Sequence, residues 1–337
     1  MYAIDDDSDL PPCLDTRLKQ AVWARKIVDM LSAENPAIAT RTPPQDGAFS
    51  RTVIVTLQDK QDVVIQFRRG MLDTARYFLA RQTLGAMVPE VIHVQDKFLE
   101  AAGAWIYWSP FIPGITWEAA EMEPNYSKVP VLRSLGCVLS KGFLEPTSHS
   151  AMPGIEKHLR LILASKDPTV IGFRTQTQEF LDQLHLLSSL PLFLSHHDLY
   201  EGNVIVGDDR EVIGLIDWDK STPLPFGMGF GRLHILAGEY DEGVFKLPND
   251  YFVAEAAFWQ GVWSGLPANV LHKVNDKLEV VQIALALGYF LEAFYLDEGD
   301  AVSSSYNPVI VRALKKLLTY RLLMLRSDGE APYADDD

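Results

Sequence analysis

The residues with the clearest chemical potential lie in the stretch HHDLYEGN (residues 196–203), which is followed by IDWD (residues 216–219). The first stretch reads H-x-D-x-x-x-x-N, and Asp217 lies 14 residues beyond Asn203. A carboxylate at the start of a loop can accept the proton of a hydroxyl group. Carboxylate and amide oxygens are the hard ligands that Mg²⁺ prefers. A proton acceptor and a bound metal are what phosphoryl transfer requires of a protein.

Asp198 is therefore the predicted catalytic base, and Asn203 and Asp217 are the predicted metal ligands. This arrangement requires two strands that bring Asn203 and Asp217 together. The apolar runs at residues 204–206 and 212–216, separated by the polar turn GDDR, predict such a hairpin. A single Asp or Asn in a loop is more often a turn or cap residue, but the three in this order and spacing favour a site.

These motifs resemble those of the aminoglycoside phosphotransferase and choline-kinase-like family. Its members carry H-G-D-x-x-x-x-N and then, after a hydrophobic strand, I-D-W-E/D. The sequence departs from this pattern at His197, where the family usually has Gly, which would alter substrate access but not metal binding. The segment TPLPFGMGFGRLHILAG (residues 222–238) resembles the corresponding segment of fungal-type members. The resemblance covers the chain loosely and is strongest over residues 195–231.

The resemblance implies an α+β, bilobal protein-kinase-like fold with a small β-rich N-lobe and a larger, mainly helical C-lobe. It implies an ATP- and Mg²⁺-dependent enzyme that moves the γ-phosphate of ATP to a hydroxyl of a small-molecule acceptor. It also implies that His196 shapes the loop and that Asp219 either supports the metal or binds backbone amides. Trp218 replaces the Phe of the protein-kinase D-F-G motif, and the protein-kinase substrate-anchoring motif is absent, which favours a small acceptor.

The surrounding elements follow the expected order of such a fold. Residues 14–34 have helical periodicity, with Leu14, Leu18, Val22, Ile27 and Leu31 on one face. Runs of β-branched residues at 52–57 and 63–67 flank the turn QDKQ, and a helix over about 72–84 closes at Gly85. These elements predict a nucleotide-covering N-lobe over residues 14–112. Helical patterns predict a C-lobe over 113–328, with acidic, disordered tails at 1–13 and 329–337.

The nucleotide phosphates need a loop and a cation. The resemblance places the covering loop at residues 47–50, so Ser50 is assigned to nucleotide binding, although an ordinary turn is as good an explanation of a single Gly. On the next strand Arg68 is the predicted phosphate contact, because Arg binds phosphate bidentately. Gln66 shares its strand face and is the alternative. Asp73 is either the acidic partner of this cation or a helix N-cap.

Adenine binding is assigned to the connector between the predicted lobes. Pro110 has no N–H, which leaves the carbonyl oxygen of Ser109 and the N–H of Phe111 as the predicted partners.

Composition narrows the class of protein. A formal net charge of −15 argues against a nucleic-acid-binding surface; it could attract a cationic substrate, although solubility explains it more simply. No apolar run reaches the roughly 18 residues of a membrane helix, and the N-terminus lacks the basic and apolar regions of a secretory signal. We therefore expect a cytoplasmic protein without membrane contact. Two widely separated cysteines predict neither a disulfide framework nor a zinc site.

The acceptor is poorly specified by the sequence. Acidic residues late in the chain could contact an amine and aromatic residues could frame a pocket, although solvated faces and core packing are the simpler explanations: Glu239, Asp241, Glu242, Glu292, Asp297 and Glu298, and Phe258, Trp259, Trp263, Tyr289, Phe290 and Phe294. Two other functions remain open. The chain could be a nucleotide-binding pseudoenzyme that serves interaction, or an ATP-dependent enzyme that uses phosphate activation to form another bond.

Overall fold

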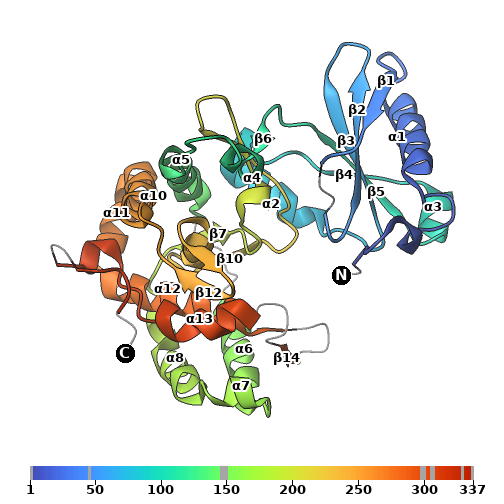
Figure 1. Ribbon diagram of the computed structural model, residues 1–337. Coiled ribbons are helices and arrows are strands. Elements are labelled where there is room, and N and C mark those ends of the chain that lie inside the picture. The colour runs from blue at the N-terminus through green and yellow to red at the C-terminus, as the bar shows by residue number, and fades with distance from the viewer. Residues whose placement is uncertain are drawn as a thin grey trace. The chain divides into compact units, whose positions relative to one another are not determined.

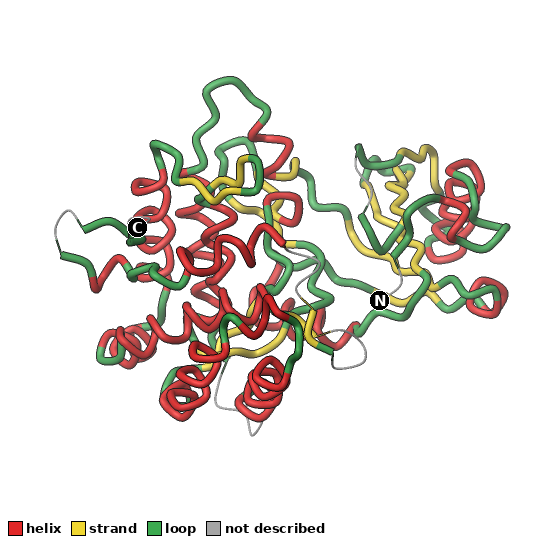
Figure 2. The backbone as a smooth tube through the Cα atoms, turned by 60° about the horizontal axis from the view of Figure 1, so that its bottom comes forward, coloured by secondary structure: helices red, strands yellow, loops and turns green. Residues whose placement is uncertain are grey.

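The computed structural model describes residues 3–44, 47–144, 151–296, 301–303, 308–327 and 330–334. The chain forms two compact units. Unit 1 comprises residues 1–113 together with 214–219, and unit 2 comprises residues 114–213 and 220–337. The short segment with the IDWD motif therefore belongs to unit 1, although the chain on both sides of it belongs to unit 2. Figures 1 and 2 show the elements of each unit.

Unit 1 is built on an antiparallel five-stranded sheet in the order β1-β2-β3-β5-β4. One face of β3 is buried, and helix α1 packs against β1 and β2 (Figure 1). The predicted hairpin is confirmed: β2 and β3 pair directly across the turn that contains Lys60. The bounds are α1 Arg17–Leu31, β1 Ala37–Arg41, β2 Arg51–Leu57, β3 Asp62–Arg68, α2 Thr74–Leu84, β4 Ile92–Val94, α3 Lys97–Ala101 and β5 Trp105–Pro110, with 3₁₀ turns η1 Asp7–Asp9 and η2 Gly85–Met87.

The first helix exists, but only part of its predicted apolar face is buried: Leu14, just before the helix, is 0% exposed and Ile27 is 2% exposed. Leu18, Val22 and Leu31 are 76%, 59% and 50% exposed. The buried face also includes Val28, the fully buried Ala24, and Gln20, which donates its amide to the carbonyl oxygen of Leu14 (2.9 Å).

The prediction of disordered tails is wrong for the described residues of both ends. Ile4 and Leu10 are each 3% exposed and lie in the core of unit 1. Asp7 accepts from Arg51 at 2.8 Å, which ties this acidic segment to β2. At the other end Tyr333 is buried. Ile4 and Leu10 lie on either side of the acidic run DDDSD, so the polar composition of the segment as a whole gives no sign that these two side chains are buried.

Unit 2 is mainly helical, as Figure 2 shows in red, with short strands at its edges. The strand pairs are β7–β10, β11–β12 and β13–β14, and β6, β8 and β9 form a three-stranded sheet. Strand β9 begins in unit 2 and ends in unit 1. The helices are α4 Trp117–Glu121, α5 Val129–Leu139, α6 Met152–Ala164, α7 Pro168–Ile171, α8 Arg174–Leu187, α9 Leu233–Leu236, α10 Tyr251–Gly265, α11 Ala268–Asn275, α12 Leu278–Ala293 and α13 Pro308–Leu317.

The remaining elements of unit 2 are short. The strands are β6 Ile115–Thr116, β7 Leu192–Ser195, β8 Val204–Val206, β9 Val212–Leu215, β10 Thr222–Pro225, β11 Glu239–Asp241, β12 Val244–Lys246, β13 Tyr295–Leu296 and β14 Val302–Ser303, and the 3₁₀ turns are η3 Ser140–Gly142, η4 Glu201–Asn203, η5 Met228–Arg232 and η6 Leu323–Leu325. None of the helices in the described part of the chain is long and apolar enough to span a membrane.

Helices α5 and α10 pack closely, and glycines permit this approach. A Cβ atom at Gly261 would lie 2.1 Å from the carbonyl oxygen of Arg133. We expect Gly261→Ala to lower the free energy of unfolding by about 2 kcal/mol, because the backbones must separate. Gly154 is the matched control: it also lies in a helix, but its Cβ would meet nothing within 4 Å. Gly154→Ala should stabilise by about 0.5 kcal/mol. Urea denaturation measures both, and equal effects of the two changes would contradict this packing.

Candidate active site

The loop after β7 is held on both sides of Asp198. The amide N–H of Asp198 donates to Nδ1 of His196 (3.3 Å), and the side chain of His196 is 2% exposed. Further along, Nδ2 of Asn203 donates to the carbonyl oxygen of Asp198 (2.7 Å). These contacts are of the kind expected if His196 shapes the loop, a role that stays a prediction. They define the backbone position from which the Asp198 carboxylate projects.

The carboxylate of Asp198 is accessible. Its side chain is 29% exposed, and Lys220 Nζ lies 3.6 Å from Oδ2. The Lys220 side chain is 45% exposed, so solvent screens this ion pair and it is worth at most about 1 kcal/mol. A substrate hydroxyl can therefore approach Asp198 without displacing a strongly bound group.

The side-chain amide of Asn203 is oriented by the same contact. Because its nitrogen donates to the Asp198 carbonyl, its oxygen is the end that can face a cation. Asn203 is 5% exposed and directly precedes β8, which is the neighbour of β9 in the sheet. The predicted hairpin after Asn203 is therefore confirmed.

The IDWD segment is anchored inside unit 1. Trp218 is fully buried, and its Nε1 donates to the carbonyl oxygen of Leu215 (2.9 Å). Asp217 has a φ of 61°, a left-handed conformation that Asp adopts more readily than most residues. Backbone strain of this kind is concentrated at functional sites. The buried indole holds the chain while Asp217 takes the unusual conformation.

Asp219 and Arg68 form a buried ion pair within unit 1. Nη2 of Arg68 lies 2.5 Å from Oδ2 of Asp219, and each side chain is 5% exposed. The Tyr77 hydroxyl donates to Oδ1 of Asp219 (2.8 Å) and lies 3.5 Å from Oδ1 of Asp217. Burial and the charges of both carboxylates raise the pKa of Tyr77 well above its usual value, so the phenol stays a hydrogen-bond donor.

The acidic partner of Arg68 is thus Asp219, and not Asp73 as one reading of the sequence predicted. Asp73 caps α2 by accepting from the N–H of Ala75 (3.2 Å) and pairs with Arg76 (3.2 Å). The N-cap alternative is therefore the one that the structure supports. An internal counter-ion role suits the low exposure of Arg68, and its contact with phosphate stays a prediction. Gln66 lies on the same strand and is half-buried.

The predicted adenine contact at Phe111 needs correction. Its N–H donates to the carbonyl oxygen of Asp62 (3.2 Å), which continues the pairing of β3 with β5. The pairing extends one residue beyond the end of β5, so the N–H of Phe111 already has a hydrogen-bond partner. Ser109 pairs with Val64 in the same ladder, but its carbonyl oxygen has two lone pairs and so stays a candidate acceptor.

Hydrogen bonds from Arg51 and from the N-terminal segment hold the loop before β2. Ser50 is 5% exposed. Arg51 donates to the carbonyl oxygens of Gly47 and Ser50, both at 3.4 Å, and Ile4 donates its N–H to Ala48 (2.8 Å). The sequence could not reveal this brace, because it depends on the N-terminal segment. The nucleotide-binding role of Ser50 stays a prediction.

The residues present fit a magnesium ion better than a zinc ion. No group of three or more His, Cys, Asp or Glu side chains within the described ranges could hold a metal. Zinc sites need three or four such ligands, whereas Mg²⁺ is held by one or two carboxylates together with water and substrate phosphates. Asn203 offers an oriented amide oxygen in unit 2 and Asp217 a carboxylate in unit 1, and each by itself is an oxygen ligand of the kind that Mg²⁺ accepts.

The candidate acceptor residues have mostly structural surroundings. Glu292 pairs with Arg232 (3.0 Å) and His234 (3.3 Å). Burial opposes its ionisation, but the charge of Arg232 and the contact with His234 outweigh burial and lower the pKa of Glu292. Asp241 pairs with Lys246, and Asp297 and Glu298 lie outside the described residues. Several of the aromatic candidates are core residues with at most 1% exposure: Phe258, Trp259, Tyr289, Phe290 and Phe294.

Two glutamates of unit 2 have unusual environments. Burial raises the pKa of Glu201, in the turn that precedes β8, and also the pKa of Glu121 in α4, and each feels the charges of other acidic groups in unit 2. The burial of Glu201 depends on α4 packing against η4, a contact that no local sequence pattern indicates.

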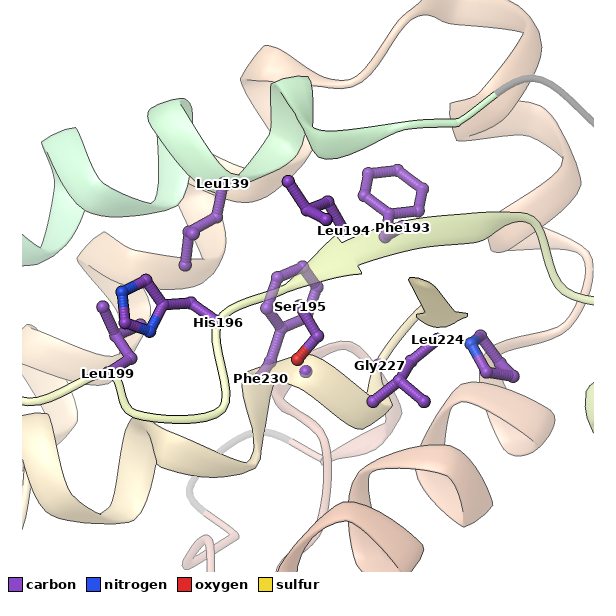
Figure 3. A pocket seen from close by; sticks show the side chains of 11 residues that line it. Leu139, Phe193, Leu194, Ser195, His196, Leu199, Leu224, Gly227 and Phe230 are labelled. Carbon is purple, nitrogen blue, oxygen red and sulfur yellow. The ribbon is translucent and has the colours of Figure 1, made fainter. Parts of the chain in front are cut away.

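A small pocket borders the candidate catalytic loop (Figure 3). Its walls are mostly apolar, and Asp198 and Asn203 are not among them. It is therefore a packing gap that borders His196 and not a substrate site. The lining residues are Leu139, Phe193, Leu194, Ser195, His196, Leu199, Leu224, Pro225, Gly227, Gly229 and Phe230.

Known proteins share this fold. No curated protein matches the sequence significantly. An ethanolamine kinase of Plasmodium vivax is 11% identical over 90% of this chain and 90% of its own, with a TM-score of 0.52. An amicoumacin kinase in complex with AMP-PNP and Ca²⁺ is 14% identical over 88% and 95%, with a TM-score of 0.51. A mutant of the aminoglycoside phosphotransferase APH(4)-Ia, with AMP-PNP and hygromycin B, is 14% identical over 86% and 97%, with a TM-score of 0.52.

Residues 40–246 match the phosphotransferase enzyme family, APH. This match spans more than half of the chain and contains the candidate catalytic loop and the IDWD segment. The predicted family, enzyme class and protein-kinase-like fold are confirmed, whereas the resemblance to fungal-type members stays a prediction. The protein belongs to the phosphotransferase enzyme family.

Proposed function

We propose that the protein transfers the γ-phosphoryl group of ATP to a hydroxyl of a small molecule in a Mg²⁺-dependent reaction. Asp198 is the base, and Asn203 and Asp217 are the metal ligands. The observation that carries this proposal is the hydrogen bond from Asn203 to the carbonyl oxygen of Asp198. One contact orients a metal-binding oxygen and fixes the backbone of the base.

The steps fall to identified groups of the chain. Asp198 would accept the proton of the acceptor hydroxyl as its oxygen attacks the γ-phosphorus and the bond to the β-phosphate oxygen breaks. Bound Mg²⁺ would offset the charge of the phosphates. The loop contacts of His196 and Asn203 keep the base in place, so positioning, and not covalent participation, is the main contribution of the protein.

ATP as the donor is supported by the family match and by the AMP-PNP in two proteins of similar fold. Ser50 and Ser109 are proposed nucleotide contacts. The nucleotide-covering role of residues 14–112 and the substrate role of 113–328 are proposals on the same basis. Amino-alcohols, sugars and antibiotic-like secondary metabolites are the acceptor classes to test first.

Product analysis distinguishes this proposal from its two rivals. The protein is incubated with γ-labelled ATP and a panel of these acceptors, with Mg²⁺ or with EDTA. We expect label in an acceptor only when Mg²⁺ is present. Metal-dependent nucleotide binding without any labelled or ligated product would favour a pseudoenzyme. Labelled phosphate released together with an unlabelled ligation product would favour phosphate activation for another bond.

A further inference from the structure

Helix α2 contacts both acidic residues of the IDWD segment within unit 1. The Tyr77 hydroxyl lies 2.8 Å from Oδ1 of Asp219 and 3.5 Å from Oδ1 of Asp217. On the preceding residue, Nη1 of Arg76 donates to the carbonyl oxygen of Asp219 (2.7 Å). Strand β3 adds Arg68 at 2.5 Å from Oδ2. Asp219 is therefore bound at both carboxylate oxygens and at its backbone carbonyl.

This binding assigns different tasks to the two carboxylates. Asp219 is 8% exposed, and a buried carboxylate must be paired. Arg68 and Tyr77 supply that pairing, so the oxygens of Asp219 are occupied by protein groups. These contacts favour a structural role for Asp219, and we take Asp217 as the proposed metal ligand from this segment.

The same hydroxyl also approaches the metal ligand itself. The carboxylates of Asp217 and Asp219 both lie near the hydroxyl of Tyr77. That hydroxyl has a single proton to donate. Its short contact is with Asp219, and its longer one limits the positions that Asp217 can take. Asp217 sits in a left-handed conformation that needs support from its surroundings. Tyr77 is 5% exposed and cannot easily move away.

We propose, on the basis of the function proposed above, that Tyr77 is a positioning residue that orients Asp217 for the metal through a clamp with Asp219, Arg68 and Arg76. Within this clamp Asp219 is the acidic partner of Arg68, a place for which Asp73 at the start of α2 was the alternative. Groups that hold metal ligands in place typically change metal affinity 10–100-fold when they are removed.

The test compares two buried tyrosines of the same unit. Tyr77→Phe removes the hydroxyl that contacts the carboxylates. Tyr107→Phe is the matched control, because its hydroxyl accepts from the N–H of Leu72 (2.7 Å) and its side chain is 1% exposed. Calorimetry measures AMP-PNP binding as Mg²⁺ is titrated. We expect Tyr77→Phe to raise the Mg²⁺ concentration for half-maximal binding about 10-fold, with Tyr107→Phe within about twofold of wild type.

A second variant keeps the test decisive if Tyr77→Phe does not fold. Arg76 has a side chain that is 44% exposed, so Arg76→Met should be tolerated and should shift the Mg²⁺ requirement in the same direction by a smaller factor. An unchanged Mg²⁺ requirement in the folded variants would overturn the proposal. Asp217→Asn separates this result from failure of the proposed function: if it too leaves Mg²⁺-dependent binding unchanged, the metal site is wrong, and if it abolishes that binding, only the clamp is wrong.

Discussion

Replacing Asp198 with Asn is expected to lower the rate of phosphoryl transfer by about 10²–10⁴-fold, the usual contribution of general base catalysis. Asn has nearly the same shape as Asp but cannot accept the proton at neutral pH. The loop contacts involve the backbone of Asp198 and should persist, since Asn203 binds its carbonyl oxygen and His196 its N–H. Nucleotide affinity should therefore remain close to that of wild type, and the loss should be confined to kcat.

The control for this change is Asp208→Asn. Asp208 lies in the exposed turn between β8 and β9, in the same unit and with the same change of charge. It should retain wild-type kcat and KM in steady-state assays. If both variants lose activity equally, net charge and not a specific base explains the effect.

Replacing Asp217 with Asn is expected to remove the Mg²⁺-dependent part of nucleotide binding, with a loss of affinity of at least about 10-fold. Asn tolerates the left-handed conformation that Asp217 adopts. An Ala variant would add backbone strain to the loss of the carboxylate, so Asn isolates the effect of charge. Calorimetric titration of AMP-PNP with and without Mg²⁺ measures the difference.

Asp59→Asn is the matched control in unit 1. Asp59 is exposed in the turn between β2 and β3 and accepts from the N–H of Gln61 (3.0 Å), a contact that Asn can retain. Its Mg²⁺ response should equal that of wild type. If Asp217→Asn retained the full Mg²⁺ response, Asp217 would not be a metal ligand.

The parts of the site that sequence could predict are local ones. Asp198 and Asn203 lie five residues apart in one loop, so their spacing alone indicates that they act together, and the hydrogen bond between them agrees with this. The hairpin after Asn203 could be predicted because β-branched runs flank a polar turn. In each case the information lies within about 20 residues of chain.

The predictions that were wrong concern contacts between segments that lie far apart in the sequence. Arg68 pairs with Asp219 across 151 positions, and no local pattern indicates this partner. The N–H of Phe111 donates to the carbonyl oxygen of Asp62, because the ladder between β3 and β5 continues one residue further than expected. The N-terminal segment was expected to be disordered because it is acidic, yet Ile4 and Leu10 bury in the core. Average composition cannot show which few residues are anchors.

Asp198 is proposed to activate an acceptor hydroxyl for attack on the γ-phosphorus of ATP. The most direct measurement follows the transfer of label from γ-labelled ATP, with Mg²⁺, into the components of a metabolite extract, for wild type and Asp198→Asn at equal nucleotide saturation. We predict a labelled acceptor with the wild type and its loss with the variant. Label transfer that is undiminished in Asp198→Asn would show that Asp198 is not the base.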